Sequence, residues 1–155
     1  MLGKDVPLEN IVVPPDVEMF LCGWLRSALR RRGYDVEVSN KEPADLSFPL
    51  GRPLIVVRDD GGPQTEIVTY NRAVTFNVLG GTRQDTKPTM DLARLVYALA
   101  MSESVCLAEG SPIAAVDRTT GRGPYLVNDT VDTTRAYITV DYLLVGEAMP
   151  LYTNP

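Results

Sequence analysis

Two adjacent carboxylates, Asp59 and Asp60, come closest to an acid-base or metal-binding pair in this sequence of 155 residues. Either role needs further acidic groups that converge on the pair from other parts of the chain. Gly61, Gly62 and Pro63 follow directly, and an Asp-Gly pair supplies the positive φ angles of a tight turn. We therefore interpret the whole run as a hairpin turn.

Imidazole and thiol chemistry are poorly represented. The chain has no histidine, which removes the commonest general base, the commonest metal ligand and every Ser-His or Cys-His arrangement. Cys22 and Cys106 each lie in an apolar segment, and neither belongs to the CxxC spacing of zinc sites. We expect two buried free thiols in a reducing compartment, and a chain that is not an enzyme and needs no cofactor or metal.

Two glycine-rich segments raise the question of phosphate binding. Gly80–Arg83 and Gly121–Gly123 match neither the P-loop pattern GxxxxGK[ST] nor a GxGxxG run that opens a helix. We interpret both as flexible loops, with a turn at Gly121–Pro124.

The charge pattern bears on possible partners. A net charge of −5 repels a phosphate backbone, so we expect no broad basic surface for DNA. Arg30, Arg31 and Arg32 nevertheless form a basic run at the end of a predicted helix. The run has two interpretations: a solvated helix end that complements the helix dipole, or a contact with an acidic neighbouring copy.

Two helices are predicted. Asp16 is a suitable N-cap for a helix over Val17–Arg32 that ends at Gly33. A second helix over Pro88–Glu103 is apolar around most of its circumference, partly through Tyr97, so it is either deeply buried or packed on a neighbour. The apolar stripe of the first helix follows 3.6-residue spacing and comprises Val17, Phe20, Leu21, Trp24, Leu25, Ala28 and Leu29.

The remaining segments predict an α+β fold, with two main helices on a mainly antiparallel sheet. We expect a single domain: an extended, proline-containing arm at 1–15, a core at 16–147 and a tail at 148–155. Pro- and Gly-rich loops are expected at Asn40–Arg52 and Gly80–Lys87, and both are candidates for movement on docking. Strands are predicted at Tyr34–Ser39, Pro53–Arg58, Gln64–Tyr70, Ala73–Leu79, Ile113–Thr119, Tyr125–Val127 and Thr134–Val145.

Neither a signal peptide nor an apolar run of the ~20 residues that cross a bilayer is visible. We therefore expect the chain to remain in the cytoplasm where it is made, without contact with a membrane.

Several segments follow one another in a characteristic order. The order begins with the helix VEMFLCGWLRSALRRRG, which is followed by the Pro-rich segment Lys41–Pro53 and the run PLIVVRDDGG. The strand Ala73–Leu79, the helix DLARLVYALA, the GRGP segment and the long last strand come next. This layout, over about Val17–Gly146, resembles the tail terminator, or tail-completion, family of long-tailed bacteriophages, particularly those that infect actinobacteria.

This resemblance implies a structural virion subunit that is assembled in the host cytoplasm and located in the tail or neck. It implies a homohexameric ring that caps the tail tube, stops its polymerisation and joins the tail to the connector complex of the head. The partners would be other copies of the chain, the tube protein and a head-completion or connector protein. DNA would pass through the ring without sequence-specific binding, and the family has no catalytic residues to carry over.

A ring needs two different surfaces that meet between copies, and the arm and the second helix are candidates. An acidic subunit around a pore would let DNA slide past. Another neck or head-completion ring is an alternative function. A third hypothesis, from a different class, is a ligand-binding or enzymatic domain that uses Arg58, Asp59 and Asp60 in a cleft. The candidate interface residues are Arg30, Arg31, Arg32 and Tyr97, together with the possible pore acids Asp85, Asp129 and Asp132.

Overall fold

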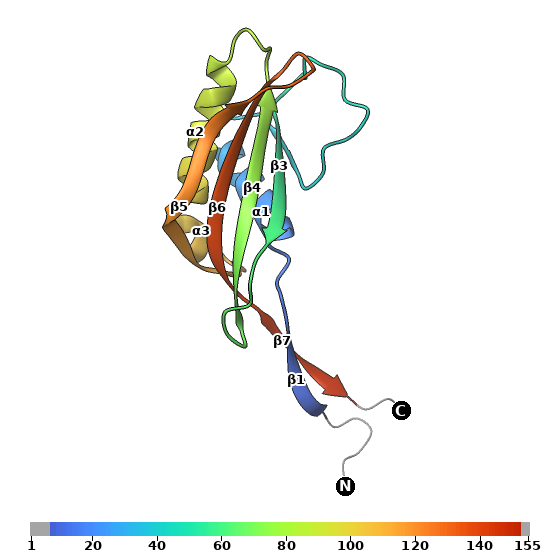
Figure 1. Ribbon diagram of the computed structural model, residues 1–155, viewed down its shortest axis with the longest axis vertical. Coiled ribbons are helices and arrows are strands. Elements are labelled where there is room, and N and C mark those ends of the chain that lie inside the picture. The colour runs from blue at the N-terminus through green and yellow to red at the C-terminus, as the bar shows by residue number, and fades with distance from the viewer. Residues whose placement is uncertain (1–6, 153–155) are drawn as a thin grey trace.

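The computed structural model describes residues 7–152, so the expectations for 1–6 and 153–155 lie outside the described residues. Ten elements follow one another along the chain (Figure 1). They are β1 (Pro7–Val13), α1 (Val17–Arg31), β2 (Glu37–Ser39), β3 (Leu54–Gly61), β4 (Thr69–Gly80), α2 (Lys87–Ala100), α3 (Ser104–Leu107), β5 (Ile113–Val127), β6 (Thr134–Val145) and β7 (Glu147–Tyr152).

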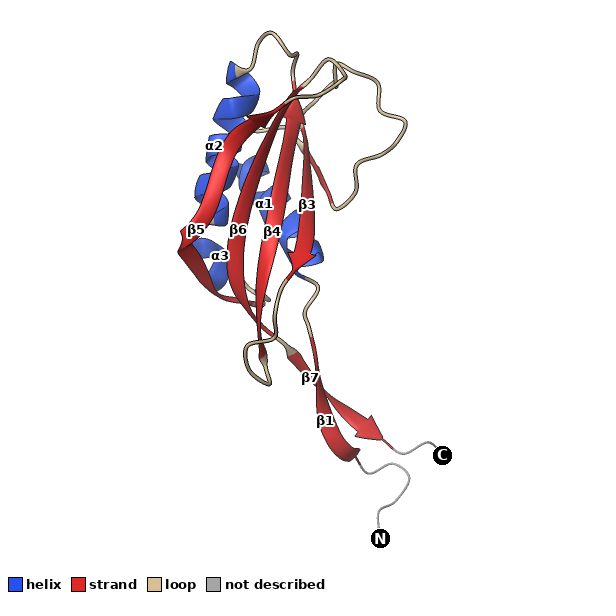
Figure 2. Cartoon of the chain, in the orientation of Figure 1, coloured by secondary structure: helices blue, strands red, loops and turns tan. Residues whose placement is uncertain are grey.

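The body of the molecule is a five-stranded sheet in the order β2-β3-β4-β6-β5. Only the short pair β2–β3 is parallel, and the other neighbours are antiparallel. Helices α1 and α2 cover one face of the sheet, and no helix of the described residues lies over the opposite face (Figure 2). The α+β prediction is confirmed. We call the face without helices the open face.

Local signals set the bounds of α1. Asp16 accepts a hydrogen bond from the backbone N–H of Met19 at 3.0 Å, which satisfies one of the free donors at the start of the helix. The helix ends at Arg31, one residue before its predicted end, and Gly33 adopts a φ of 84° after the C-cap Arg32. The second helix is shorter than predicted: α2 ends at Ala100, and the separate short α3 follows it.

The core lies between the helices and the sheet. Residues of β6 alternate between buried and half-buried positions, as the period of a strand requires, and the buried set faces the helices. Tyr142 belongs to this set, and its hydroxyl donates to the carbonyl of Ala100 on α2 at 2.6 Å. A smaller apolar cluster lies on the open face, where the 40–52 loop covers it; it consists of Leu46, Phe48, Leu50, Leu54, Val56 and Leu79.

The hairpin turn predicted at Asp59–Pro63 is wrong. Asp59, Asp60 and Gly61 continue β3, with an irregular register around Asp60, and the chain reverses only after Gly61. The predicted strands Gln64–Tyr70 and Ala73–Leu79 are also not separate. Apart from an isolated bridge between Gln64 and Tyr70, they are replaced by β4, which pairs with β6 without interruption from Thr69 to Gly80. Tertiary pairing has overridden the local turn signal.

The turn predicted at Gly121–Pro124 is wrong as well, because β5 runs through it as an edge strand. The register with β6 is irregular on both sides of Arg122. Gly123 has a φ of 102°, and a Cβ there would lie 2.4 Å from the carbonyl oxygen of Tyr137. These residues therefore mark an irregularity in an edge strand, where Gly and Pro are tolerated.

The two ends of the described chain form a separate ribbon. β1 and β7 pair with each other in an antiparallel two-stranded sheet that projects from the lower end of the body (Figure 1). The extended conformation expected for the N-terminal arm is thus confirmed for Pro7–Val13. The pairing with the predicted tail was not expected. We call this two-stranded sheet the terminal ribbon.

Candidate functional site

The arginine run lies at the C-terminal end of α1, and all three side chains are exposed. The guanidinium of Arg32 donates to the carbonyl of Ala28 at 2.9 Å. This hydrogen bond to a carbonyl of the last turn is the contact expected of a residue that complements the helix dipole. Arg30 and Arg31 remain available to a partner.

Tyr97 is half-buried on α2 and lies beneath the irregular part of β5. A Cβ at Gly121 would lie 3.3 Å from the Tyr97 hydroxyl. The other apolar side chains that extend the apolar face of α2 around the helix are buried against the sheet of the same chain. Packing within the chain therefore accounts for the apolar character of α2 around most of its circumference. The buried residues of α2 are Thr89, Leu92, Ala93, Val96, Leu99 and Ala100.

The three predicted pore acids lie in the two loops at the end of the body opposite the terminal ribbon. Asp132 accepts a hydrogen bond from the backbone N–H of Arg83 at 3.0 Å, which connects the loop after β5 to the loop after β4. Asp85 is exposed, and its own N–H donates to the Thr82 hydroxyl at 3.2 Å. The fold therefore gathers these acids from separate parts of the chain.

Asp129 differs from the other two because it is paired. Arg135 on β6 donates to Asp129 through Nε at 2.5 Å and to Glu42 through Nη1 at 2.7 Å. The side chains of Arg135 and Asp129 are each only 12% exposed. Burial opposes the charge of Asp129, but hydrogen bonds from Arg135 and from the Val131 N–H outweigh it and lower the pKa of Asp129. Its negative charge is thus largely compensated within the chain.

The Arg135 guanidinium also attaches the 40–52 loop to the sheet. Burial again opposes the charge, and the hydrogen bonds and charges of Glu42 and Asp129 outweigh it and raise the pKa of Arg135. Because the loop covers the upper part of the open face, this contact fixes one border of that face.

Asp59 and Asp60 do not form one site. Asp59 faces the helix side of the sheet, where its carboxylate accepts from Arg72 at 3.2 Å. Asp60 faces the open side, where it pairs with Arg58 and accepts from the Thr75 hydroxyl. Neighbouring residues of a strand point to opposite faces, so continuing β3 through the pair separates the two carboxylates.

The uncovered part of the open face is a mixed polar and aromatic surface. The rings of Tyr125 and Tyr137 meet edge-on across β5 and β6, with centroids 6.1 Å apart. The next cross-strand rows bring Arg122 opposite Thr139, and then Asp117 opposite Asp141. This alternation of aromatic, basic and acidic rows suits a polar partner surface better than an apolar ligand.

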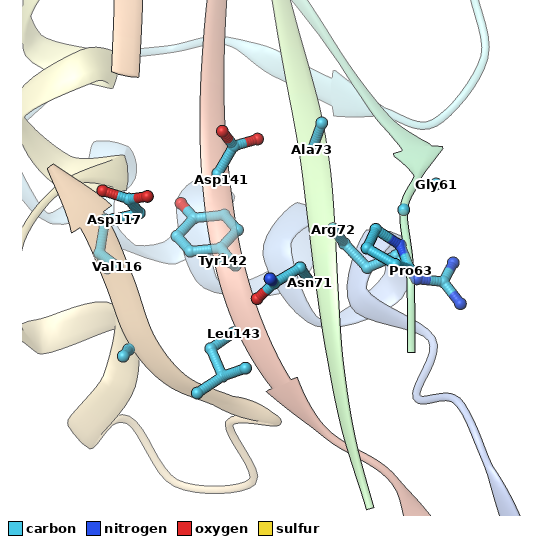
Figure 3. Close-up of a pocket in the computed structure, with 12 residues that line it drawn as sticks. Gly61, Pro63, Asn71, Arg72, Ala73, Val116, Asp117, Asp141, Tyr142 and Leu143 are labelled. Atoms are coloured by element: carbon cyan, nitrogen blue, oxygen red, sulfur yellow. The ribbon is translucent and has the colours of Figure 1, made fainter. Parts of the chain in front are cut away.

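The acidic row borders a shallow depression of about 340 Å³ between β3, β4, β6 and β5 (Figure 3). Asp117 and Asp141 stand side by side there, while Leu143 and Asn71 line the part of the depression below them. Hydrogen bonds from the Thr119 hydroxyl and N–H lower the pKa of Asp117. Within residues 7–152, no ion pair involves Asp141.

Sequence reasoning missed this acidic row. The alternation in Thr134–Val145 already placed Asp141 on the same side as Tyr137 and Thr139. The position of Asp117 opposite Asp141 depends on β5 continuing past the glycines that we interpreted as a turn.

The described part of the chain offers no ready arrangement of side chains for metal binding or for thiol chemistry. No group of three or more Cys, Asp or Glu side chains in residues 7–152 is placed to hold a metal ion. Burial is the largest influence on both cysteines and raises the pKa of each thiol. Cys22 is buried as predicted, whereas Cys106 is only half-buried. No helix in the described residues has the length and apolar character to cross a membrane.

Comparison of the sequence with protein-family models gave no match, and comparison with curated proteins gave none either.

Proposed function

We propose that this chain is a structural subunit that works by self-assembly into a ring, and that the ring is a phage tail terminator. In this proposal the ring caps the tail tube, stops its growth and joins the tail to the head connector. The chain acts through its surfaces and carries out no reaction. It needs no cofactor, and DNA passes through the ring without sequence-specific contacts.

The terminal ribbon is the observation that carries the proposal. A two-stranded ribbon is marginally stable by itself in water, because it lacks a covered apolar face. The terminal ribbon projects from the body, and Ile11 and Met149 on it are 43% and 48% exposed (Figure 1). An arm of this kind gains stability when it packs on another molecule, as the copies of a ring do.

The charge distribution also favours this function. Asp85 and Asp132 are exposed at one end of the body, and Asp117 and Asp141 lie on the open face. Repeated around a ring, an acidic surface repels a phosphate backbone and lets it slide past. The carboxylates of Asp59 and Asp60 face opposite sides of the sheet, which favours the assembly function over the enzymatic alternative.

Light scattering coupled to size exclusion tests the assembly step. We expect a discrete oligomer, with the hexamer as the size that the resemblance implies, either for the chain alone or on addition of tail tubes. A monomer at high concentration in both conditions would overturn the proposal.

Electron microscopy tests the place of the ring in the virion. Particles of a phage that lacks this gene should show overlong tails without heads, because nothing stops tube growth. Normal-length tails without heads would instead favour the alternative of a head-side neck protein. Pull-down against tube protein and portal-side proteins separates the two in solution.

A further inference from the structure

The terminal ribbon and its base form one uncovered apolar surface. Six of the eleven exposed large apolar side chains of the described residues lie there. At the base, the N–H of Gly146 donates to the carbonyl of Val68 at 2.7 Å, which holds the loop between β3 and β4 against the start of the ribbon. Surfaces of this kind mark contacts with another molecule. The six residues are Ile11, Val13, Ile67, Val68, Val145 and Met149.

A second uncovered surface is a groove of about 300 Å³ between α3 and the outer side of β5, lined by small and apolar side chains and by the charged Glu103 and Arg118. Leu107 stands on its α3 side and is 81% exposed. Ala114 and Ala115 on the β5 side are small, so they leave space for the side chains of a binding partner. Cys106 lines the same groove. We call it the α3–β5 groove.

The position of β5 adds a reason for this groove to be covered. β5 is one of the two edge strands of the five-stranded sheet, and no strand of residues 7–152 pairs with its outer side. A long edge strand exposes unpaired backbone groups and is normally protected by a neighbour. The segment from Ile113 to Val116 forms this edge beside the groove.

The two surfaces lie on different sides of the body. In Figure 1, α3 and β5 are at the left border of the sheet, whereas the terminal ribbon leaves the lower end and leans to the right. The ribbon is therefore directed away from the groove of its own chain. Two different surfaces of one subunit produce head-to-tail contacts between copies, which close into a ring when the rotation between copies permits.

Charge complementarity favours a second copy of the chain as the partner that binds the α3–β5 groove. Glu147 begins the β7 strand of the ribbon and is exposed, and Arg118 at the border of the groove is exposed as well. Neither takes part in an ion pair within residues 7–152. One surface thus offers apolar side chains with an acid, and the other offers a groove that carries one base, Arg118, and one acid, Glu103.

We propose that the terminal ribbon of one copy packs into the α3–β5 groove of the next copy, with Glu147 within reach of Arg118. This proposal rests on the self-assembly in the proposed function and names the surfaces that meet. It does not depend on the tail tube as a partner.

Cross-linking between two thiols tests the contact directly. In the variant Met149→Cys, a short bismaleimide should join the new thiol on the ribbon to the native Cys106 in the groove. Cys22 is buried, so it should not react in the folded chain. Each copy carries both thiols, and we therefore expect a ladder of covalent oligomers in a denaturing gel.

Two controls make the result specific. Adding Cys106→Ala to Met149→Cys should abolish the ladder, and the native chain without Met149→Cys should give none. A dimer that persists in the double variant would show ribbon-to-ribbon contact and overturn the proposal. Absence of the ladder in a sample that light scattering shows to be oligomeric would overturn it too, while leaving the proposed function intact. A chain that stays monomeric under every condition overturns both.

Charge reversal provides a second, independent measurement. Glu147→Arg should lower the oligomeric fraction at least tenfold at a concentration where the native chain is half assembled, and so should Arg118→Glu. The double variant should recover most of the assembly. Asp45→Arg, on the loop at the far end of the body, is the matched control and should have no effect. No recovery in the double variant would contradict the pairing.

Discussion

Asp117 on β5 and Asp141 on β6 are direct cross-strand partners on the open face, although both carry negative charge. Like charges at opposite positions of a sheet are destabilising, so this pair costs the isolated chain some stability. Hydrogen bonds within β5 from Thr119 stabilise the charged form of Asp117. No comparable group of the described residues compensates Asp141. The arrangement therefore leaves a negative site on an otherwise mixed surface.

Asp141→Asn should stabilise the isolated chain because it removes this repulsion. We expect the free energy of unfolding to rise by about 0.5 kcal/mol. Urea denaturation at low salt measures it, and the gain should shrink as salt screens the charges. Asp45→Asn on the 40–52 loop is the matched control, for which we expect no gain. A loss of stability in Asp141→Asn would show that a contact within the chain requires the carboxylate.

Arg135→Ala should destabilise the chain, because it leaves Asp129 largely buried without its partner and releases Glu42. We expect a loss of about 2 kcal/mol, below the range for fully buried pairs since some exposure remains. The control is Arg52→Ala, whose pair with Asp35 is exposed and should contribute under about 1 kcal/mol. Equal losses in the two variants would contradict the importance of the Arg135 contact.

The lowered pKa of Asp129 predicts a pH dependence of stability. A carboxylate whose pKa is lower in the folded chain contributes its full stabilisation above its unfolded pKa of about 3.9. That contribution is lost as the pH falls through the folded pKa. Unfolding measured from neutral to acidic pH should show a constant difference between native and Asp129→Asn above about pH 5, which shrinks below it. A difference independent of pH would refute a lowered pKa.

Gly23→Ala should raise the stability of α1. Gly23 is exposed inside the helix, and a Cβ at this position would meet nothing within 4 Å. Replacing glycine with alanine in a helix gains about 0.5–1 kcal/mol. Gly123→Ala should instead lower the stability of the folded chain, because its Cβ would clash with the backbone of β6. Thermal unfolding of both variants checks the pair, and a loss in Gly23→Ala would indicate a close neighbour at that surface.

Elements with a strong internal period were predictable. The first helix carries its own cap at Asp16 and its own stop at Gly33, so its bounds were correct within one residue. The strand Thr134–Val145 was predicted with its observed bounds, because alternation persists over its whole length. Both signals arise within a few residues of the chain.

The turns predicted at Asp59–Pro63 and Gly121–Pro124 were wrong for the same reason. Gly61 and Gly123 have the φ values that suit turns, yet each lies in a strand with an irregular register. Whether a positive φ produces a turn or a bulge depends on the strand that pairs alongside. That strand is distant in the sequence, so local reasoning could not distinguish the two.

The candidate surfaces likewise combine features that local sequence determined with features that only the folded chain decided. The amino-acid sequence by itself determined the absence of histidine chemistry, the acidic balance and the apolar faces that require an α+β sandwich, because these depend on residue type and local period. Only the tertiary structure decided that Asp117 meets Asp141, that Arg135 neutralises Asp129 and that the two chain ends pair as a ribbon. Strand pairing and burial in the folded chain set these contacts. Neither follows from the residue types and the local period of the sequence.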